Sequence, residues 1–182
     1  MSKPTEKELI ELFKKGHQQD YVFNILVDEY KVRLYWHIRK ILVNHEDTDD
    51  ILQNTFIKAW KGLDNFREDS NLFTWLYRIA TNEALSFLRQ KKRANFLPWS
   101  GVEKNLSETL ESDEYFNGDA IQLKLQKAIF TLPEKQKIVF NMKYFDEMKY
   151  EDMSEILKTS VGALKASYHH AVKKIEKYMN EN

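Results

Sequence analysis

The sequence predicts an all-α protein that consists of two small helical domains. Apolar residues recur every three or four positions along most of the 182-residue chain, and this spacing is typical of one face of an α-helix. Only five glycines and three prolines interrupt it, and no stretch alternates between apolar and polar residues for long enough to indicate a β-sheet. We expect the first domain to span residues 1–93 and the second to span residues 119–182.

Each expected helix carries its own apolar stripe. Residues 3–15 are expected to form a short amphipathic helix that belongs to the first domain. Three longer stripes of that domain are Val22, Ile25, Leu26, Tyr30 and Leu34, then Ile51, Leu52, Phe56, Ala59 and Trp60, then Leu72, Trp75, Leu76, Ile79, Ala80, Ala84, Leu85 and Leu88. The stripe of the second domain comprises Ile121, Leu125, Ala128, Ile129 and Leu132, and continues with Ile138, Val139 and Met142. Pro133 suits the first turn of a new helix, where its missing N–H leaves no hydrogen bond unmade.

Between the two domains the helical periodicity fades. Residues 94–118 contain Pro98, Gly101 and Gly118 and are rich in serine, asparagine and acidic residues. Over residues 94–120, one lysine stands against six aspartates and glutamates, whereas both flanking segments are mildly basic. This composition is typical of a linker, so we expect an acidic flexible connection over residues 94–118.

Composition narrows the compartment and the chemistry. The chain contains no cysteine, which excludes disulfides and thiolate metal sites and is typical of a reducing cytoplasm. No apolar run approaches the roughly 20 residues that a membrane span needs, and the polar start at residues 1–5 does not resemble a signal peptide. We therefore expect a soluble cytoplasmic protein without membrane insertion.

Residues 149–170 have the pattern of a helix-turn-helix. Met153, Ile156 and Leu157 supply the apolar face of its first helix. Ser160 is a favourable N-cap for the second helix, and Leu164 is placed to pack back on the first. The second helix of such a motif enters the major groove of DNA. Its exposed face is expected to contact base edges and phosphates through Lys165, Ser167, His169, His170, Lys173 and Lys174.

Two other interpretations of this segment remain. It is also compatible with an ordinary helical hairpin that carries a solvated lysine face. The adjacent His169 and His170 could suggest a metal site. Neighbours on a helix point about 100° apart, however, and do not share an ion easily, so we predict no metal there.

A polar helix face is expected within residues 47–60. Asp50, Gln53, Asn54 and Lys58 line this face opposite the apolar residues of the helix, and Asp47 stands among the acids of the first turn. Helix capping and a solvated face are one explanation, because the helix dipole favours acids in the first turn. A docking surface for a basic or polar partner helix is the other.

Residues 64–82 combine aromatic rings with arginines and amides, and a basic cluster follows at Arg89, Lys91, Lys92 and Arg93. Aromatic rings stack on unpaired bases for about 1–3 kcal/mol each, and amides can read the exposed edges of a flipped base. We therefore predict contacts to single-stranded DNA from Asn65, Phe66, Arg67, Asn71, Phe73, Trp75, Arg78 and Asn82. Trp75 is equally suited to the core.

These motifs together resemble the sigma-70 family, in particular its extracytoplasmic-function (ECF) group. The resemblance to sigma region 2 rests on Asp47, Asp50, Gln53, Phe56 and Trp60 and on the segment from Phe66 to Asn82. Leu132-Pro133-Glu134 and the helix-turn-helix resemble sigma region 4. Both halves occur in the order of the family and cover nearly the whole chain.

The resemblance implies partners and roles. Asp47, Asp50, Gln53 and Asn54 would dock on the β′ clamp helices of core RNA polymerase, and the second domain would meet the β flap. The 64–82 segment would capture a base of the minus-ten element, and the helix at 161–177 would read the minus-thirty-five element. The acidic linker would thread toward the active-site cleft. Catalysis would belong to the polymerase, so we predict no catalytic residue, cofactor or metal in this chain, and an anti-sigma factor as a further partner.

Some positions depart from the family pattern. Ser86 stands where an aspartate is frequent, and Lys158 replaces the usual turn glycine, so it must accept a left-handed or adjusted backbone. Differences in the second helix of the helix-turn-helix, at Ala163, Ser167, His169 and His170, prevent the transfer of a known minus-thirty-five sequence.

Two alternatives belong to other functional classes. A conventional helix-turn-helix regulator would not bind core polymerase, and it leaves the 47–60 and 64–82 segments unexplained. A metal-dependent hydrolase would use clustered acids, here His45, Glu46, Asp47, Asp49 and Asp50. These residues spread around the start of one helix, and no second cluster stands out.

Overall fold

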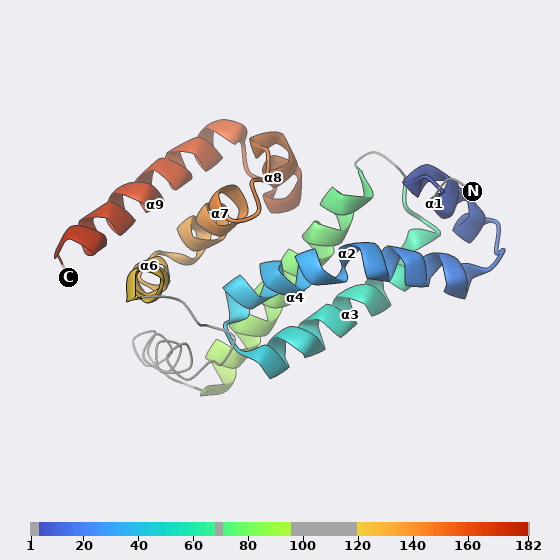
Figure 1. The fold of residues 1–182 in the computed structure, drawn as a ribbon, viewed down its shortest axis with the longest axis horizontal. Helices are drawn as coiled ribbons and strands as arrows, with labels where there is room; N and C mark the ends of the chain where they lie inside the picture. Colours follow the sequence, from blue (N-terminus) through green and yellow to red (C-terminus); the bar gives the residue numbers. More distant parts are fainter. Residues whose placement is uncertain (1–3, 68–70, 96–119, 182) are drawn as a thin grey trace.

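The computed structural model describes residues 4–67, 71–95 and 120–181, and these residues form eight helices and no strand (Figure 1). The helices are α1 (Glu6–Lys14), α2 (Gln19–Leu42), α3 (His45–Leu63), α4 (Leu72–Asn95), α6 (Ala120–Phe130), α7 (Glu134–Tyr144), α8 (Tyr150–Leu157) and α9 (Val161–Glu181). The predicted all-α class is confirmed. The described helices include none that is long and apolar enough to cross a membrane.

The first domain is built from α1 to α4. Thr5 starts α1 with a capping box, in which its side chain and that of Glu8 each accept from the other's backbone N–H. Asn44 caps α3 in a simpler way, because its Oδ1 accepts from the N–H of Asp47 at 2.9 Å. The long helices α2, α3 and α4 lie side by side and α1 covers one end of them (Figure 1).

Aromatic rings fill the end of this domain where α1 packs. Phe13 of α1 meets the ring of Trp60 edge-on at 5.1 Å between centroids, and Phe23 meets Trp60 at 5.0 Å. Edge-to-face pairs of this kind add about 0.5–1.5 kcal/mol each beyond the burial of their area. The predicted short amphipathic helix is therefore part of the domain core, with Leu9, Ile10 and Phe13 buried.

The second domain contains α6 to α9. Phe140 of α7 stacks on Tyr168 of α9 at 5.8 Å between ring centroids, and Ala128, Leu132 and Ile175 are buried around this pair. Pro133 stands one position before the first residue of α7, as its N-cap. One expected core position is wrong: Ile121 is 67% exposed, because α6 has only just begun there.

The two domains pack against each other. One buried apolar cluster includes Leu34, Ile38 and Leu76 from the first domain and Met142 and Met153 from the second. Helix α8 lies against α4, and α7 lies against α2 (Figure 1). The predicted linker lies outside the described residues, except that α4 continues through residues 94 and 95.

Candidate nucleic-acid and partner interfaces

The helix-turn-helix is formed by α8 and α9. Lys158, the C-cap of α8, has φ 52° and ψ 42° and so lies in the left-handed region. The sequence predicted a left-handed or adjusted backbone for this lysine. Ser160 accepts a hydrogen bond from the N–H of Ala163 at 3.3 Å, as expected of the N-cap of α9. Leu164 is buried and belongs to the same apolar cluster as Met153 and Ile156 of α8. The local structure therefore agrees with the sequence prediction.

Helix α9 has a buried face and a basic face. Its buried face carries Leu164, Ala171 and Ile175. Two exposed rows lie on the other side, Lys165–His169–Lys173 and His170–Lys174, with steps of four residues in each. Ser167 is only half-buried. All six residues that we predicted to meet duplex DNA are therefore at least partly accessible, and five are fully exposed.

Helix α3 presents the predicted docking face to solvent. Asp50, Gln53 and Asn54 are exposed. Asp47 is half-buried instead, because its carboxylate accepts from Lys91 Nζ of α4 at 2.6 Å. Sequence reasoning missed Ile57, which is 46% exposed and follows Gln53 and Asn54 on the same face. The sequence signal that could have identified it is an isoleucine at helical spacing from the polar residues Gln53 and Asn54.

Helix α4 carries the candidate single-strand interface along one stripe. Asn71, Trp75, Arg78 and Asn82 follow one another at steps of four, three and four residues, so they share a face. Asn71 is exposed and also caps the helix, because its Oδ1 accepts from the N–H of Thr74 at 2.7 Å. Trp75 and Arg78 are half-buried, and Asn82 is exposed. Asn65 and Arg67, in the connection before α4, are exposed as well.

The two phenylalanines of this segment lie elsewhere than expected. Phe66 is only 5% exposed and packs against Trp75 at 5.2 Å between ring centroids. Phe73 is half-buried. The Arg33 guanidinium lies 4.2 Å from its ring centroid, and the centroid of the Tyr77 ring lies 4.3 Å from it. Phe66 is therefore too buried to offer a ring face to a base, and the Arg33 guanidinium lies over one face of Phe73.

A second stripe of α4 consists of Thr74, Tyr77 and Thr81, each one position before a member of the first stripe. Thr74 Oγ1 lies 3.4 Å from a carboxylate oxygen of Asp152 in α8. Thr81 Oγ1 contacts His37 Nε2 of α2 at 2.8 Å. The Thr74–Asp152 contact between the two domains therefore lies on a different side of α4 from the Asn71–Trp75–Arg78–Asn82 stripe.

Charged groups are buried at this junction. His37 is 1% exposed, and its Nδ1 lies 3.0 Å from Oδ2 of Asp146. The other carboxylate oxygen of Asp146, Oδ1, accepts from Lys40 Nζ at 2.6 Å. Burial opposes ionisation of Asp146. The hydrogen bonds and charges of His37 and Lys40 outweigh it and lower the pKa of this carboxyl below its ordinary value. Burial, with the Asp146 charge, raises the pKa of Tyr77. Sequence reasoning found none of these residues.

The acids at the start of α3 are engaged in ordinary surface pairs. Asp47 pairs with Lys91, and Asp49 lies 3.4 Å from His45 Nε2. Within the parts of the chain that the structure describes, no three His, Asp or Glu side chains are grouped so that they could hold a metal ion.

Comparisons with known proteins agree with this arrangement. The family profile described as Sigma-70 region 2 matches residues 26–94, and the profile described as Sigma-70, region 4 matches residues 122–175. The ECF RNA polymerase sigma factor SigW of Bacillus subtilis (strain 168) is 33% identical, over 96% of this chain and 97% of its own length.

Two solved structures share the fold. The sigma factor RpoE from Bartonella quintana, solved in complex with the anti-sigma factor NepR, has a TM-score of 0.68 and 20% identity, and the match covers 88% of this chain and 98% of RpoE. CnrH, solved in complex with the cytosolic domain of CnrY, has a TM-score of 0.70 and 22% identity. The match covers 96% of this chain and 96% of CnrH. The profiles for both sigma regions, in that order, together with the identity to SigW over nearly the whole length, identify this protein as a member of the ECF group of the sigma-70 family.

Proposed function

We propose that this chain binds core RNA polymerase and directs promoter recognition, strand opening and the start of transcription, without catalysis of its own. The observation that carries the proposal is the presence in one chain of two separate surfaces whose side chains suit nucleic acid. One is the basic face of α9, and the other is the polar and aromatic stripe of α4. Because the polymerase is its expected partner, the protein would act in the cytoplasm and would need no cofactor.

The basic face of α9 suits duplex DNA. Lys165 and His169, in the N-terminal half of the helix, are placed to contact base edges in the major groove. Lys173 and Lys174 lie one to two turns further along and suit phosphates. Contacts of the first kind specify sequence, whereas contacts of the second kind fix the position of the protein on the duplex.

The α4 stripe suits an unpaired base. Asn82 offers donors and an acceptor to a base edge, and Arg78 lies one turn before it on the same face. Phe66 is buried and the Arg33 guanidinium lies over the ring of Phe73, so we expect Trp75 to be the residue that stacks, through its accessible part. A base presents its edge to an amide only after it has left the double helix, which links this stripe to strand opening.

The exposed face of α3 is the proposed polymerase contact. Asp50, Gln53 and Asn54 supply charge and hydrogen-bonding groups, and Ile57 supplies an apolar centre. Interfaces typically combine an apolar core with a polar rim. Asp47 would contribute less than we expected from the sequence, because Lys91 already neutralises its carboxylate.

An anti-sigma factor is the further proposed partner. Its support is that RpoE, a sigma factor of the same fold, was solved in complex with the anti-sigma factor NepR. Such a protein would compete with the polymerase for the chain.

Reconstitution with core polymerase tests the proposal. The purified chain should co-elute with core polymerase in gel filtration, and the reconstituted enzyme should open a promoter selected from a randomised library, as read by permanganate reactivity of thymines. Asn82→Ala should reduce opening and leave binding of the upstream duplex unchanged. A chain that binds duplex DNA but forms no complex with core polymerase would be a conventional regulator instead.

A further inference from the structure

We propose that α1 is a positioning element for the single-strand interface, in which Lys14 and Glu6 hold the two ends of the connection between α3 and α4. This inference rests on the function proposed for the α4 stripe. Lys14 and Glu6 themselves contact backbone groups of the connection and of α4, so they would act through the residues that meet DNA.

The two contacts bracket the connection. Lys14 Nζ donates to the backbone carbonyl of Phe66 at 2.7 Å. The backbone N–H of Leu72, the first residue of α4, donates to Oε1 of Glu6 at 3.3 Å. Lys14 and Glu6 are eight residues apart on α1, which corresponds to about 12 Å along the helix axis. One short helix therefore contacts the backbone both at Phe66, after α3, and at Leu72, where α4 begins.

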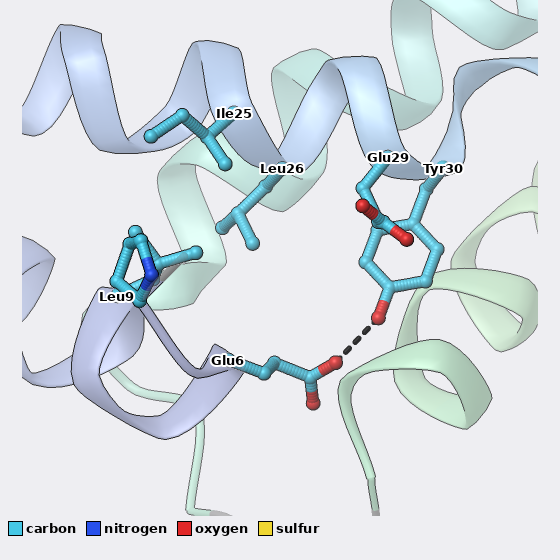
Figure 2. Close-up of a pocket in the computed structure, with 7 residues that line it drawn as sticks. Glu6, Leu9, Ile25, Leu26, Glu29 and Tyr30 are labelled. Carbon is cyan, nitrogen blue, oxygen red and sulfur yellow. Dashed lines mark hydrogen bonds between the residues drawn. The ribbon is translucent and has the colours of Figure 1, made fainter. Parts of the chain in front are cut away.

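Glu6 is itself held in place. The hydroxyl of Tyr30 in α2 donates to its second carboxylate oxygen, Oε2, as Figure 2 shows in the cleft between α1 and α2. Tyr30 is buried, and burial together with the Glu6 carboxylate raises the pKa of its hydroxyl, so the hydroxyl stays protonated and remains a donor. Each oxygen of Glu6 thus has a different partner, one on α2 and one on α4.

The contact at Leu72 matters because of where it lies. The first N–H groups of a helix have no partner within the helix, and a carboxylate there is favoured by the helix dipole. Asn71, the residue before α4, accepts a hydrogen bond from the N–H of Thr74. Glu6, from the distant helix α1, accepts one from the N–H of Leu72. Asn71 and Trp75 begin the proposed DNA stripe, so a shift at the start of α4 would move both of them.

Helix α1 is rigid enough for this role. Its first turn is closed by the Thr5–Glu8 capping box, and its inner face buries Leu9, Ile10 and Phe13 in the core of the domain. Its charged contacts with the connection are therefore anchored to the same core as α2 and α3.

The test uses reconstituted holoenzyme and a fork template that carries a single-stranded minus-ten element, selected by the parent enzyme. Glu6→Ala combined with Lys14→Ala should weaken fork binding about tenfold and leave binding of core polymerase and of upstream duplex unchanged. Glu6→Gln with Lys14→Arg keeps an acceptor and a donor, and should restore most of the affinity. Glu11→Ala with Lys15→Ala is the matched control on the exposed side of α1 and should behave like the parent.

The outcomes separate this inference from the proposed function. Unchanged fork binding by the Glu6/Lys14 double variant overturns the positioning role, whatever Asn82→Ala does. Loss of fork binding that is matched by equal loss of core-polymerase binding also overturns it, because the effect would then be general. Asn82→Ala alone decides whether the α4 stripe meets DNA. If the double variant does not fold, Tyr30→Phe, which keeps the ring and removes the hydroxyl, should still weaken fork binding selectively.

Discussion

His37 and Asp146, 109 positions apart in the chain, are joined by a buried hydrogen bond across the junction of the two domains. On the other side of the ring, Nε2 of His37 lies 2.8 Å from the hydroxyl of Thr81, which donates to the carbonyl of Tyr77 at 2.7 Å. Lys40 Nζ donates to the second carboxylate oxygen of Asp146 at 2.6 Å. Although burial opposes ionisation of Asp146, the contacts with His37 and Lys40 keep the pKa of this carboxyl below its ordinary value.

Asp146→Ala should loosen the packing of the two domains. The substitution removes the carboxylate that His37 and Lys40 contact, and a buried polar group left without its partner costs about 1–3 kcal/mol. Separation of the domains relieves that cost, so we expect a larger radius of gyration in small-angle X-ray scattering and a lower melting temperature. Glu155→Ala, an exposed acid of α8, is the control. An unchanged radius and melting temperature for Asp146→Ala would show that the pair does not hold the domains together.

The same pair predicts a stability that depends on acid pH. The pKa of Asp146 is lower in the folded protein than the ordinary value of 3.8, which approximates the unfolded chain. Its contribution is therefore complete above about pH 4 and is lost as the pH falls toward the folded-state pKa. The titratable groups that face it are His37 and Lys40 of α2 and Tyr77 of α4. Denaturant unfolding of the parent should weaken more steeply below pH 4 than that of Asp146→Asn, and parallel curves would contradict the prediction.

Lys158→Gly should stabilise the second domain. The left-handed conformation of Lys158 brings its Cβ close to the following carbonyl, at a cost of roughly 1–2 kcal/mol. Glycine removes that clash but gains freedom in the unfolded chain, so we expect a net increase of about 1 kcal/mol or less in the free energy of unfolding. Gly16 has φ +72° with open space around it, so Gly16→Ala should destabilise in the reverse sense. A decrease in stability for Lys158→Gly would mean that the lysine side chain contributes more than the strain removes.

Two kinds of α9 variant should differ in how they affect DNA binding. Lys165→Ala and His169→Ala should change the preferred upstream sequence, because a base-edge contact discriminates by about 1–3 kcal/mol. Lys173→Ala and Lys174→Ala should weaken binding to all sequences and each reduce the salt slope by about one. A promoter library measured at several salt concentrations distinguishes the two effects. If Lys165→Ala leaves the upstream preference intact, Lys165 does not read bases.

Patterns local to the sequence were enough to predict the helices, the turn of the helix-turn-helix and the exposed polar faces. These features depend on residues a few positions apart: the spacing of apolar residues places α2, α3 and α4, and Ser160 and Lys158 set the turn through local backbone geometry. Asp50, Gln53 and Lys165 could be placed on exposed faces for the same reason, because the helical period assigns each residue to a side.

Which of those residues are available, and how the domains meet, depends on packing between helices. Phe66 looked suited to a base, but it fills space beside Trp75. The resemblance assigned Asp47 to polymerase docking, but Lys91 of another helix pairs with its carboxylate. The His37–Asp146 pair and the Glu6–Leu72 contact join residues 109 and 66 positions apart. Burial and pairing depend on the surface that packs opposite a helix face, and periodicity along one helix contains no information about that surface.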